Sequence, residues 1–230
     1  MEEYKYIFDK NNCWYSSVCK LFNTDECCST CIRYLKMHYL ANTSLLTYKQ
    51  QRPISLYCVP DDFAAFTRLK QIKDNILEYV RNGNSLFLYS SNTGNGKTTW
   101  MCKLMMSYFN EIYAYTEFVP KGLFINTSMF LQGLKGEMSE YSRYIKEHIY
   151  DVDLVVWDDI FTKPYTAFEE EQLFFIIDAR INSGKSNFYT TNKPPENNMQ
   201  EISQRLLSRI YKNSERIYFN SEDLRGVNIG

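Results

Sequence analysis

The residues best suited to chemistry lie between positions 91 and 99, where the sequence reads SNTGNGKTT. Gly94 and Gly96 let the backbone approach an anion closely, and successive N–H groups in such a loop can hold phosphate oxygens. Lys97 supplies a positive charge for the phosphates, and Thr98 supplies a hydroxyl for Mg²⁺. We therefore predict a loop that binds ATP through Asn92, Thr93, Gly94, Asn95, Gly96, Lys97, Thr98 and Thr99.

Ser91 departs from the usual pattern of such loops, G-x-x-x-x-G-K-[ST], which begins with glycine. It lies where the preceding strand would end, and there glycine serves the turn more than the phosphate. We expect a small polar residue to be tolerated at this position. The alternative is a chance match in a loop that binds no nucleotide.

Three polar side chains follow two later apolar stretches. LVVWDD ends in Asp158 and Asp159, and NFYTTN ends in Asn192. Ligands of parallel sheets bind at the carboxyl ends of the strands, so we expect Asp158 to hold Mg²⁺ and Asp159 to polarise the attacking water. Asn192 would orient that water or contact the γ-phosphate. The alternatives are a solvated strand end for the acids and a turn asparagine before KPP for Asn192.

Seven cysteines occur in the chain, and five of them lie between residues 13 and 31. Four thiolates can form a tetrahedral zinc site, for which we predict the ligands Cys13, Cys19, Cys28 and Cys31, with Cys27 as an alternative to Cys28 and His38 as a spare ligand. The competing interpretation is a set of reduced thiols that pack as small hydrophobic side chains.

These residues require a scaffold, and the hydrophobic pattern predicts one in which strands alternate with helices. Such alternation indicates an α/β fold with a parallel sheet covered on both faces. We expect strands at 85–90, 123–128, 153–159, 187–192 and 216–220, and helices at 61–82, 97–113, 168–181 and 199–212, with further helical material up to about 149. The predicted organisation is a cysteine-rich domain at 1–45, a linker at 46–60 and an ATPase domain at 61–230.

Composition limits the partners. With 44% hydrophobic and 23% charged residues the chain is typical of a folded globular protein, and its net charge of -1 gives no broadly basic surface. Contact with DNA would need a local cluster, for which Phe130, Lys135, Arg143 and Lys146 are candidates, although a solvated helix face is an equal alternative. No apolar run approaches the roughly 18 residues of a membrane span, and we expect a cytoplasmic protein.

Five features in order resemble the DnaC/DnaI-type helicase loaders, a bacterial and phage branch of the AAA+ ATPases. They are the segments SNTGNGKT, VVWDD, FYTTN, QRLLSRI and FNSEDLRG, the last with no lid domain after it. The resemblance covers about residues 60–230 and implies an AAA+ P-loop domain that uses ATP and Mg²⁺. It also implies that Arg209 is the arginine finger, with Arg205 as a second candidate, and that Arg225 corresponds to a near-terminal arginine.

The same resemblance implies partners. These are a DnaB-type hexameric helicase, single-stranded DNA in replication, and further copies of the chain around the ATP site. Zinc-bearing N-terminal domains also occur among DnaI-like loaders, where they contact the helicase. Asp159 stands where many AAA+ proteins have glutamate, which is one methylene longer, so we expect hydrolysis to be slow while binding is intact. Because the resemblance implies an arginine finger that acts on the next chain, we expect the isolated protein to be a weak ATPase that a partner or DNA stimulates. Alternatives are an IstB-like transposition helper and a non-hydrolysing adaptor or inhibitor that binds the helicase.

Overall fold

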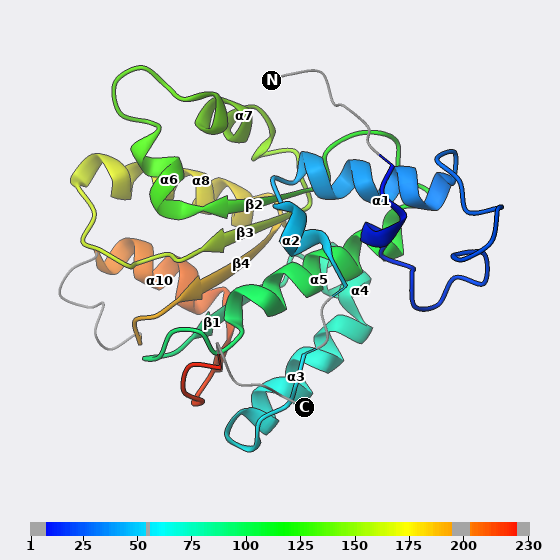
Figure 1. Cartoon of the computed structure of the whole chain (residues 1–230). Coiled ribbons are helices and arrows are strands. Elements are labelled where there is room, and N and C mark those ends of the chain that lie inside the picture. The colour runs from blue at the N-terminus through cyan, green and yellow to red at the C-terminus, as the bar shows by residue number, and fades with distance from the viewer. Residues whose placement is uncertain (1–7, 54–55, 195–202, 225–230) are drawn as a thin grey trace.

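A computed structural model describes residues 8–53, 56–194 and 203–224. Its five strands are all parallel and form one sheet in the order β2-β3-β4-β1-β5 (Figure 1). The strands are β1 (Ser85–Tyr89), β2 (Gly122–Asn126), β3 (Leu154–Asp158), β4 (Ser186–Thr191) and β5 (Ser214–Tyr218). The predicted α/β fold with a parallel sheet is confirmed.

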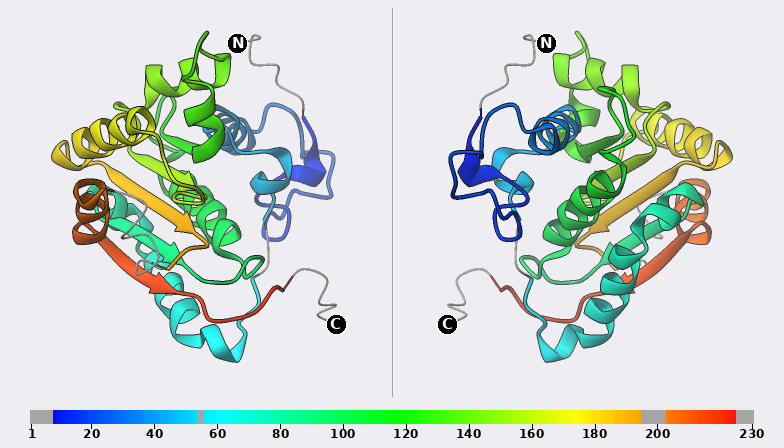
Figure 2. Two further views of the ribbon diagram at one scale, coloured as in Figure 1. Left: turned by 90° about the vertical axis from the view of Figure 1, so that its left-hand side faces the viewer. Right: turned by 90° about the vertical axis from the view of Figure 1, so that its right-hand side faces the viewer.

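The strands are buried because their side chains alternate between two hydrophobic layers. In β1, Leu86 and Leu88 face one layer and Phe87 faces the other. The first layer contains α3 (Phe63–Asp74), α4 (Ile76–Arg81) and α5 (Lys97–Ile112), and the second contains α6 (Thr127–Gln132), α7 (Glu140–His148), α8 (Ala167–Asn182) and α10 (Gln204–Lys212). Figure 2 shows the sheet between α8, in yellow, and α5, in green, on the opposite side.

The segment predicted as one helix over 61–82 is divided in the structure. A short 3-10 helix, η2 (Pro60–Asp62), precedes α3, and Asn75 separates α3 from α4. Asn75 has φ -121° and ψ 26°, outside helical geometry, and its side chain donates a hydrogen bond to the carbonyl of Gln71, 3.0 Å away. Asparagine favours such local bonds, which compete with the helix. The apolar face therefore continues across a bend.

The N-terminal segment packs on the same hydrophobic layer as α5. It contains η1 (Lys10–Asn12), α1 (Ile32–Thr43) and α2 (Tyr48–Gln51). The buried side chains of Met37, Leu40, Ala41 and Leu46 belong to the hydrophobic cluster that contains α5. The domain boundaries near 45 and 60 stay predictions, but this part of the segment shares a core with the sheet.

The end of α1 also covers an edge of the sheet. The carbonyl of Ser44 accepts a hydrogen bond from the backbone N–H of Phe124 in β2, at 2.7 Å, and the Tyr144 hydroxyl donates to the carbonyl of Thr43 at the same distance. Because β2 is an outer strand of the sheet, its free backbone groups are partly satisfied by the N-terminal segment. None of the helices in the described ranges combines the length and apolar character needed to span a bilayer.

Candidate nucleotide site

The loop predicted to bind phosphate connects β1 to α5, and its glycines are where the backbone needs them. Gly94 and Gly96 have φ values of 71° and 90°, in the left-handed region that favours glycine. A side chain at Gly96 would meet nothing within 4 Å, so the requirement there is conformational rather than steric. Ser91 is exposed and is not among the residues with positive φ. Its backbone therefore needs no glycine, and the departure from the usual pattern does not distort the loop.

A pocket of about 470 Å³ lies over this loop, here called the nucleotide pocket. It brings the loop together with the carboxyl ends of β3 and β4, as the sequence predicts. Its lining consists of Thr93, Gly94, Asn95, Gly96, Lys97, Thr98, Thr99, Asp159 and Asn192. Of the predicted ATP-binding residues, Asn92 is not part of this lining and instead supports the loop.

Asp158, at the end of β3, lies beside the first turn of α5, and its role as a Mg²⁺ ligand stays a prediction. The hydroxyl of Thr98 donates to its Oδ1 at 2.9 Å, and the hydroxyl of Thr190 donates to the same oxygen at 2.7 Å. Burial raises the pKa of Asp158, and the hydrogen bond from Thr190 opposes that rise. A hydroxyl and a carboxylate side by side suit the hard oxygen chemistry of Mg²⁺, so the residues present fit this ion.

Asp159 and Asn192 meet at the wall of the nucleotide pocket. The Asn192 amide donates to Oδ1 of Asp159 at 3.3 Å. Asp159 has φ 54°, which is unusual for a residue other than glycine, and its N–H donates to the hydroxyl of Thr190 at 2.9 Å. Thr190 thus orients both acids, a role that the sequence reasoning missed although FYTTN contains the residue.

Lys97 is buried at the first turn of α5, with 5% of its surface exposed. Its Nζ donates to the carbonyl of Asn92 at 2.9 Å and to Oδ1 of Asn95 at 2.8 Å. Burial lowers the pKa of Lys97 to about 8, although Asp159 and Asp158 act to raise it. The ammonium group is held inside the loop, where phosphate oxygens would replace its present partners.

A second support for the loop comes from residues far away in the sequence. The Asn92 amide donates to the carbonyl of Ser221 at 3.1 Å, and the N–H of Leu224 donates to the carbonyl of Gly94 at 3.2 Å. Ser221 is in turn fixed by Asp62, whose carboxylate accepts from both its N–H and its hydroxyl. No local sequence pattern indicated this support, because its parts come from opposite ends of the ATPase region.

The two arginines of α10 lie elsewhere. Arg209 forms an ion pair with Asp178 of α8, and the guanidinium of Arg205 lies 3.6 Å from the ring centroid of Phe174. With Ser208 they line a separate surface hollow of about 340 Å³. The action of Arg209 on a neighbouring chain stays a prediction. Arg225 and the beginning of the predicted helix 199–212 lie outside the described residues.

The structure does not support the predicted zinc site. Within the described ranges, no three His, Cys, Asp or Glu side chains are grouped so that they could hold a metal ion, and every cysteine is a free thiol. Cys13 and Cys19 pack against the hydrophobic layer of α5, whereas the Sγ of Cys28 is exposed and lies 3.2 Å from the Thr30 hydroxyl. Burial raises the pKa of Cys13, and the nearby thiols of Cys31, Cys19 and Cys27 add to that rise.

One candidate for DNA contact is wrong. Phe130 is fully buried, with its ring edge-on to Trp157 at 6.2 Å, and cannot stack on a base. Lys135 forms an ion pair with Glu169 at 3.0 Å. Arg143 and Lys146 are exposed on α7, where they stay candidates.

The sheet, the loop and the paired acids define an α/β P-loop domain of the AAA+ type. Residues 62–213 match the bacterial DnaA ATPase domain, which is 152 (213 − 62 + 1) of the 230 residues, and the chain belongs to this family. No curated protein sequence matches the chain.

Solved structures agree with this fold. The DnaC helicase loader is 16% identical with a TM-score of 0.58, over 72% of this chain and 93% of DnaC. DnaI is 15% identical with a TM-score of 0.58, over 75% of this chain and 88% of DnaI. The replication initiator DnaA bound to AMPPCP and single-stranded DNA is 18% identical with a TM-score of 0.55, over 73% of this chain and 49% of that one.

Proposed function

We propose that this protein is an ATP-controlled loader that binds a DnaB-type hexameric helicase and helps to place it on single-stranded DNA during replication. The observation that carries the proposal is the joined group of Thr98, Asp158, Asp159 and Asn192 beside the phosphate loop. The shared fold with DnaC and DnaI supports the choice of a loader over other members of the family.

In the proposed cycle, the loop N–H groups and Lys97 hold the phosphates of ATP, while Thr98 and Asp158 hold Mg²⁺. The metal, when bound, neutralises charge on the phosphates. Asp159, kept in place by Asn192, accepts a hydrogen bond from the attacking water and orients it. Aspartate reaches one methylene less far than glutamate, so we expect hydrolysis to be slow while binding is intact.

Self-association around the ATP site forms part of the proposal. Arg209 would act on the nucleotide of a neighbouring chain, where an added positive charge stabilises the γ-phosphoryl group during transfer. In the isolated chain Arg209 is held by Asp178, so it would have to exchange this partner on assembly. We therefore expect weak ATPase activity that rises when helicase or DNA brings chains together.

A pull-down from the native host followed by ATPase assays tests the proposal. We expect a replicative helicase to copurify and ATP turnover to rise when helicase and single-stranded DNA are added. Arg209→Ala should lose the stimulation and retain ATP binding, whereas Arg216→Ala, which removes an exposed arginine from β5, should behave as wild type.

Mixing two defective chains gives a stricter test. Arg209→Ala and Asp159→Ala damage different halves of a shared site, so the mixture should regain part of the activity. A mixture that assembles but stays inactive would show that Arg209 acts within its own chain. Helicase binding without ATP turnover under any condition would instead favour a non-hydrolysing adaptor that binds the helicase. This second candidate function is favoured by Asp159, whose side chain is shorter than the usual glutamate. Copurification with a transposase would contradict the loader.

A further inference from the structure

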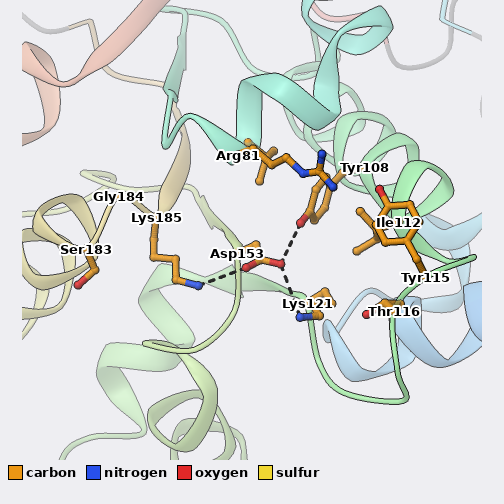
Figure 3. A pocket seen from close by; sticks show the side chains of 11 residues that line it. Arg81, Tyr108, Ile112, Tyr115, Thr116, Lys121, Asp153, Ser183, Gly184 and Lys185 are labelled. Carbon is orange, nitrogen blue, oxygen red and sulfur yellow. Dashed lines mark hydrogen bonds and ion pairs between the residues drawn. The ribbon is translucent and has the colours of Figure 1, made fainter.

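A second pocket, of about 410 Å³, opens at the amino ends of the strands, on the side of the sheet opposite to the nucleotide pocket (Figure 3). We call it the amino-edge pocket because its charged residues come just before the strands whose far ends form the nucleotide pocket. Lys121 immediately precedes β2, Asp153 precedes β3 and Lys185 precedes β4, while Arg81 ends the helix before β1. Its volume lies within the range of about 300–1,000 Å³ that small-molecule sites occupy.

The charges in this pocket are not balanced. Asp153 lies at its centre, with Oδ1 3.2 Å from the Nζ of Lys185 and Oδ2 3.9 Å from the Nζ of Lys121. Arg81 is a third cation in the lining, and no carboxylate in the described ranges pairs with it. Three cations against one carboxylate leave an excess of two positive charges. The Lys121, Lys185 and Asp153 side chains are each about one third exposed or less, whereas Arg81 is exposed, so water screens the charge of Arg81 more than that of the two lysines.

The other walls offer apolar surface and one unused hydroxyl. Tyr115 is 59% exposed, and the guanidinium of Arg81 lies 5.9 Å from its ring centroid, so the ring borders the opening. Ile112 lines the pocket on the same side but is almost fully buried, so Tyr115 supplies most of the accessible apolar surface (Figure 3). The hydroxyl of Thr116, also in the lining, is buried and has no hydrogen-bond partner in the described part of the chain. Such orphan groups are uncommon in native proteins and call for a partner.

A purely structural cluster would not account for these features. The carboxylate of Asp153 needs no further partner, because the hydroxyl of Tyr108 donates a hydrogen bond to its Oδ2 at 2.9 Å and two lysines form ion pairs with it. That arrangement fixes the carboxylate but leaves the Arg81 charge and the Thr116 hydroxyl unused. An anion would pair with the excess positive charge, whereas a cation would be repelled by it.

We propose that the amino-edge pocket binds a small organic anion in which a carboxylate or a phosphate is joined to a flat apolar group. The anionic group lies between Lys121, Lys185 and Arg81, and the apolar group lies on the exposed ring of Tyr115. Arg81 suits this role because its planar guanidinium can pair with either kind of oxyanion and still cover an aromatic ring. The site is independent of the nucleotide pocket and of the proposed loader function.

Calorimetric titration of the full chain tests the site with two probes, N-acetylphenylalanine and AMP, in the presence of excess AMPPCP and Mg²⁺ to occupy the phosphate loop. Binding of the first probe alone identifies a carboxylate ligand, and binding of AMP alone identifies a phosphate ligand. Binding of both supports the shared chemistry. Binding of neither probe overturns the proposal.

Variants give the sign of the interaction. Arg81→Gln and Lys121→Gln should each weaken the bound probe by about tenfold, the order expected for one charge-assisted hydrogen bond. Arg216→Gln on β5 is the matched control and should change nothing. Asp153→Asn should tighten binding severalfold, because it removes the carboxylate that competes for the cations. Unchanged binding in Arg81→Gln, which is exposed and safe to replace, or weaker binding in a folded Asp153→Asn, would overturn the site.

Discussion

The nucleotide pocket and the amino-edge pocket lie at opposite ends of the same strands and have similar volumes, about 470 and 410 Å³. They are built from different groups of the chain, the first from backbone and the second from side chains. The first is formed largely by a backbone loop whose glycines have left-handed conformations, and the second by side chains that five separate segments contribute. A site made from backbone needs glycine at fixed positions, so it leaves a motif in the sequence. A site made from dispersed side chains leaves none.

The largest difference between the pockets should follow from Lys97→Ala. Charge-assisted hydrogen bonds contribute about 1.5–3 kcal/mol, so ATP affinity should fall by about one to two orders of magnitude. Anion binding at the amino-edge pocket should stay within twofold of wild type, since Lys97 is not in its lining. Equilibrium binding of a fluorescent ATP analogue measures the ATP affinity, and calorimetry with the probe that binds the amino-edge pocket measures the anion affinity. Wild-type ATP affinity in this variant would contradict the assignment of the loop.

The nucleotide pocket should also respond to pH. Because burial holds the pKa of Lys97 at about 8, the free protein loses this charge as pH rises through 8, while bound phosphates favour the protonated form. ATP affinity should be constant well below pH 8 and should fall above it, by up to about tenfold per pH unit. Binding near pH 8.5 should take up protons, which titration in two buffers of different ionisation enthalpy detects. A flat affinity profile between pH 7 and 9.5 would contradict the assigned cause.

The amino-edge pocket lies beside a close contact between two turns, one containing Gly83 and the other Gly184. Gly83 and Gly136 have nearly equal φ values of 68° and 66°, but a side chain carbon at Gly83 would lie 2.6 Å from the carbonyl oxygen of Gly184, whereas one at Gly136 would meet nothing within 4 Å. Both changes to alanine strain the backbone, and Gly83→Ala should cost about 1 kcal/mol more, as overpacking does.

Urea unfolding of the two variants measures the difference, with Gly136→Ala as the control for backbone strain. Equal free energies of unfolding would show that the turn containing Gly184 moves aside at no cost. A side chain at Gly83 would press on Gly184, which lines the amino-edge pocket. Gly83→Ala should therefore weaken anion binding in that pocket and leave ATP binding intact.

The smallest effect is expected for Ser91→Gly. Ser91 is exposed, is absent from the lining of the nucleotide pocket and has no left-handed backbone, so glycine brings no benefit. ATP affinity should stay within about twofold of wild type, and stability should fall slightly because glycine has more freedom in the unfolded chain. A large gain in affinity would show that the serine impairs the loop.

The sequence predicted what local chemistry determines. The phosphate loop, Asp158, Asp159 and Asn192 follow from short patterns at strand ends, and the sheet then places them together. The burial of Phe130 does not follow from the sequence, because α6 has only six residues, too few turns to show which face is buried. Counting cysteines gave no information on distances between them. The Asp62–Ser221 support and the Arg209–Asp178 pair join residues that are far apart in the chain, and their spacing carries no signal.

The backbone hydrogen bond between Ser44 and Phe124 has a consequence for experiments with shortened chains. A shortened chain that begins after Ser44 would leave the outer side of β2 open to strands of other molecules, since unpaired edge strands promote association. Oligomers of such a shortened chain would report this exposed edge rather than assembly around ATP. Only measurements on the full chain can therefore separate functional assembly from accidental strand pairing.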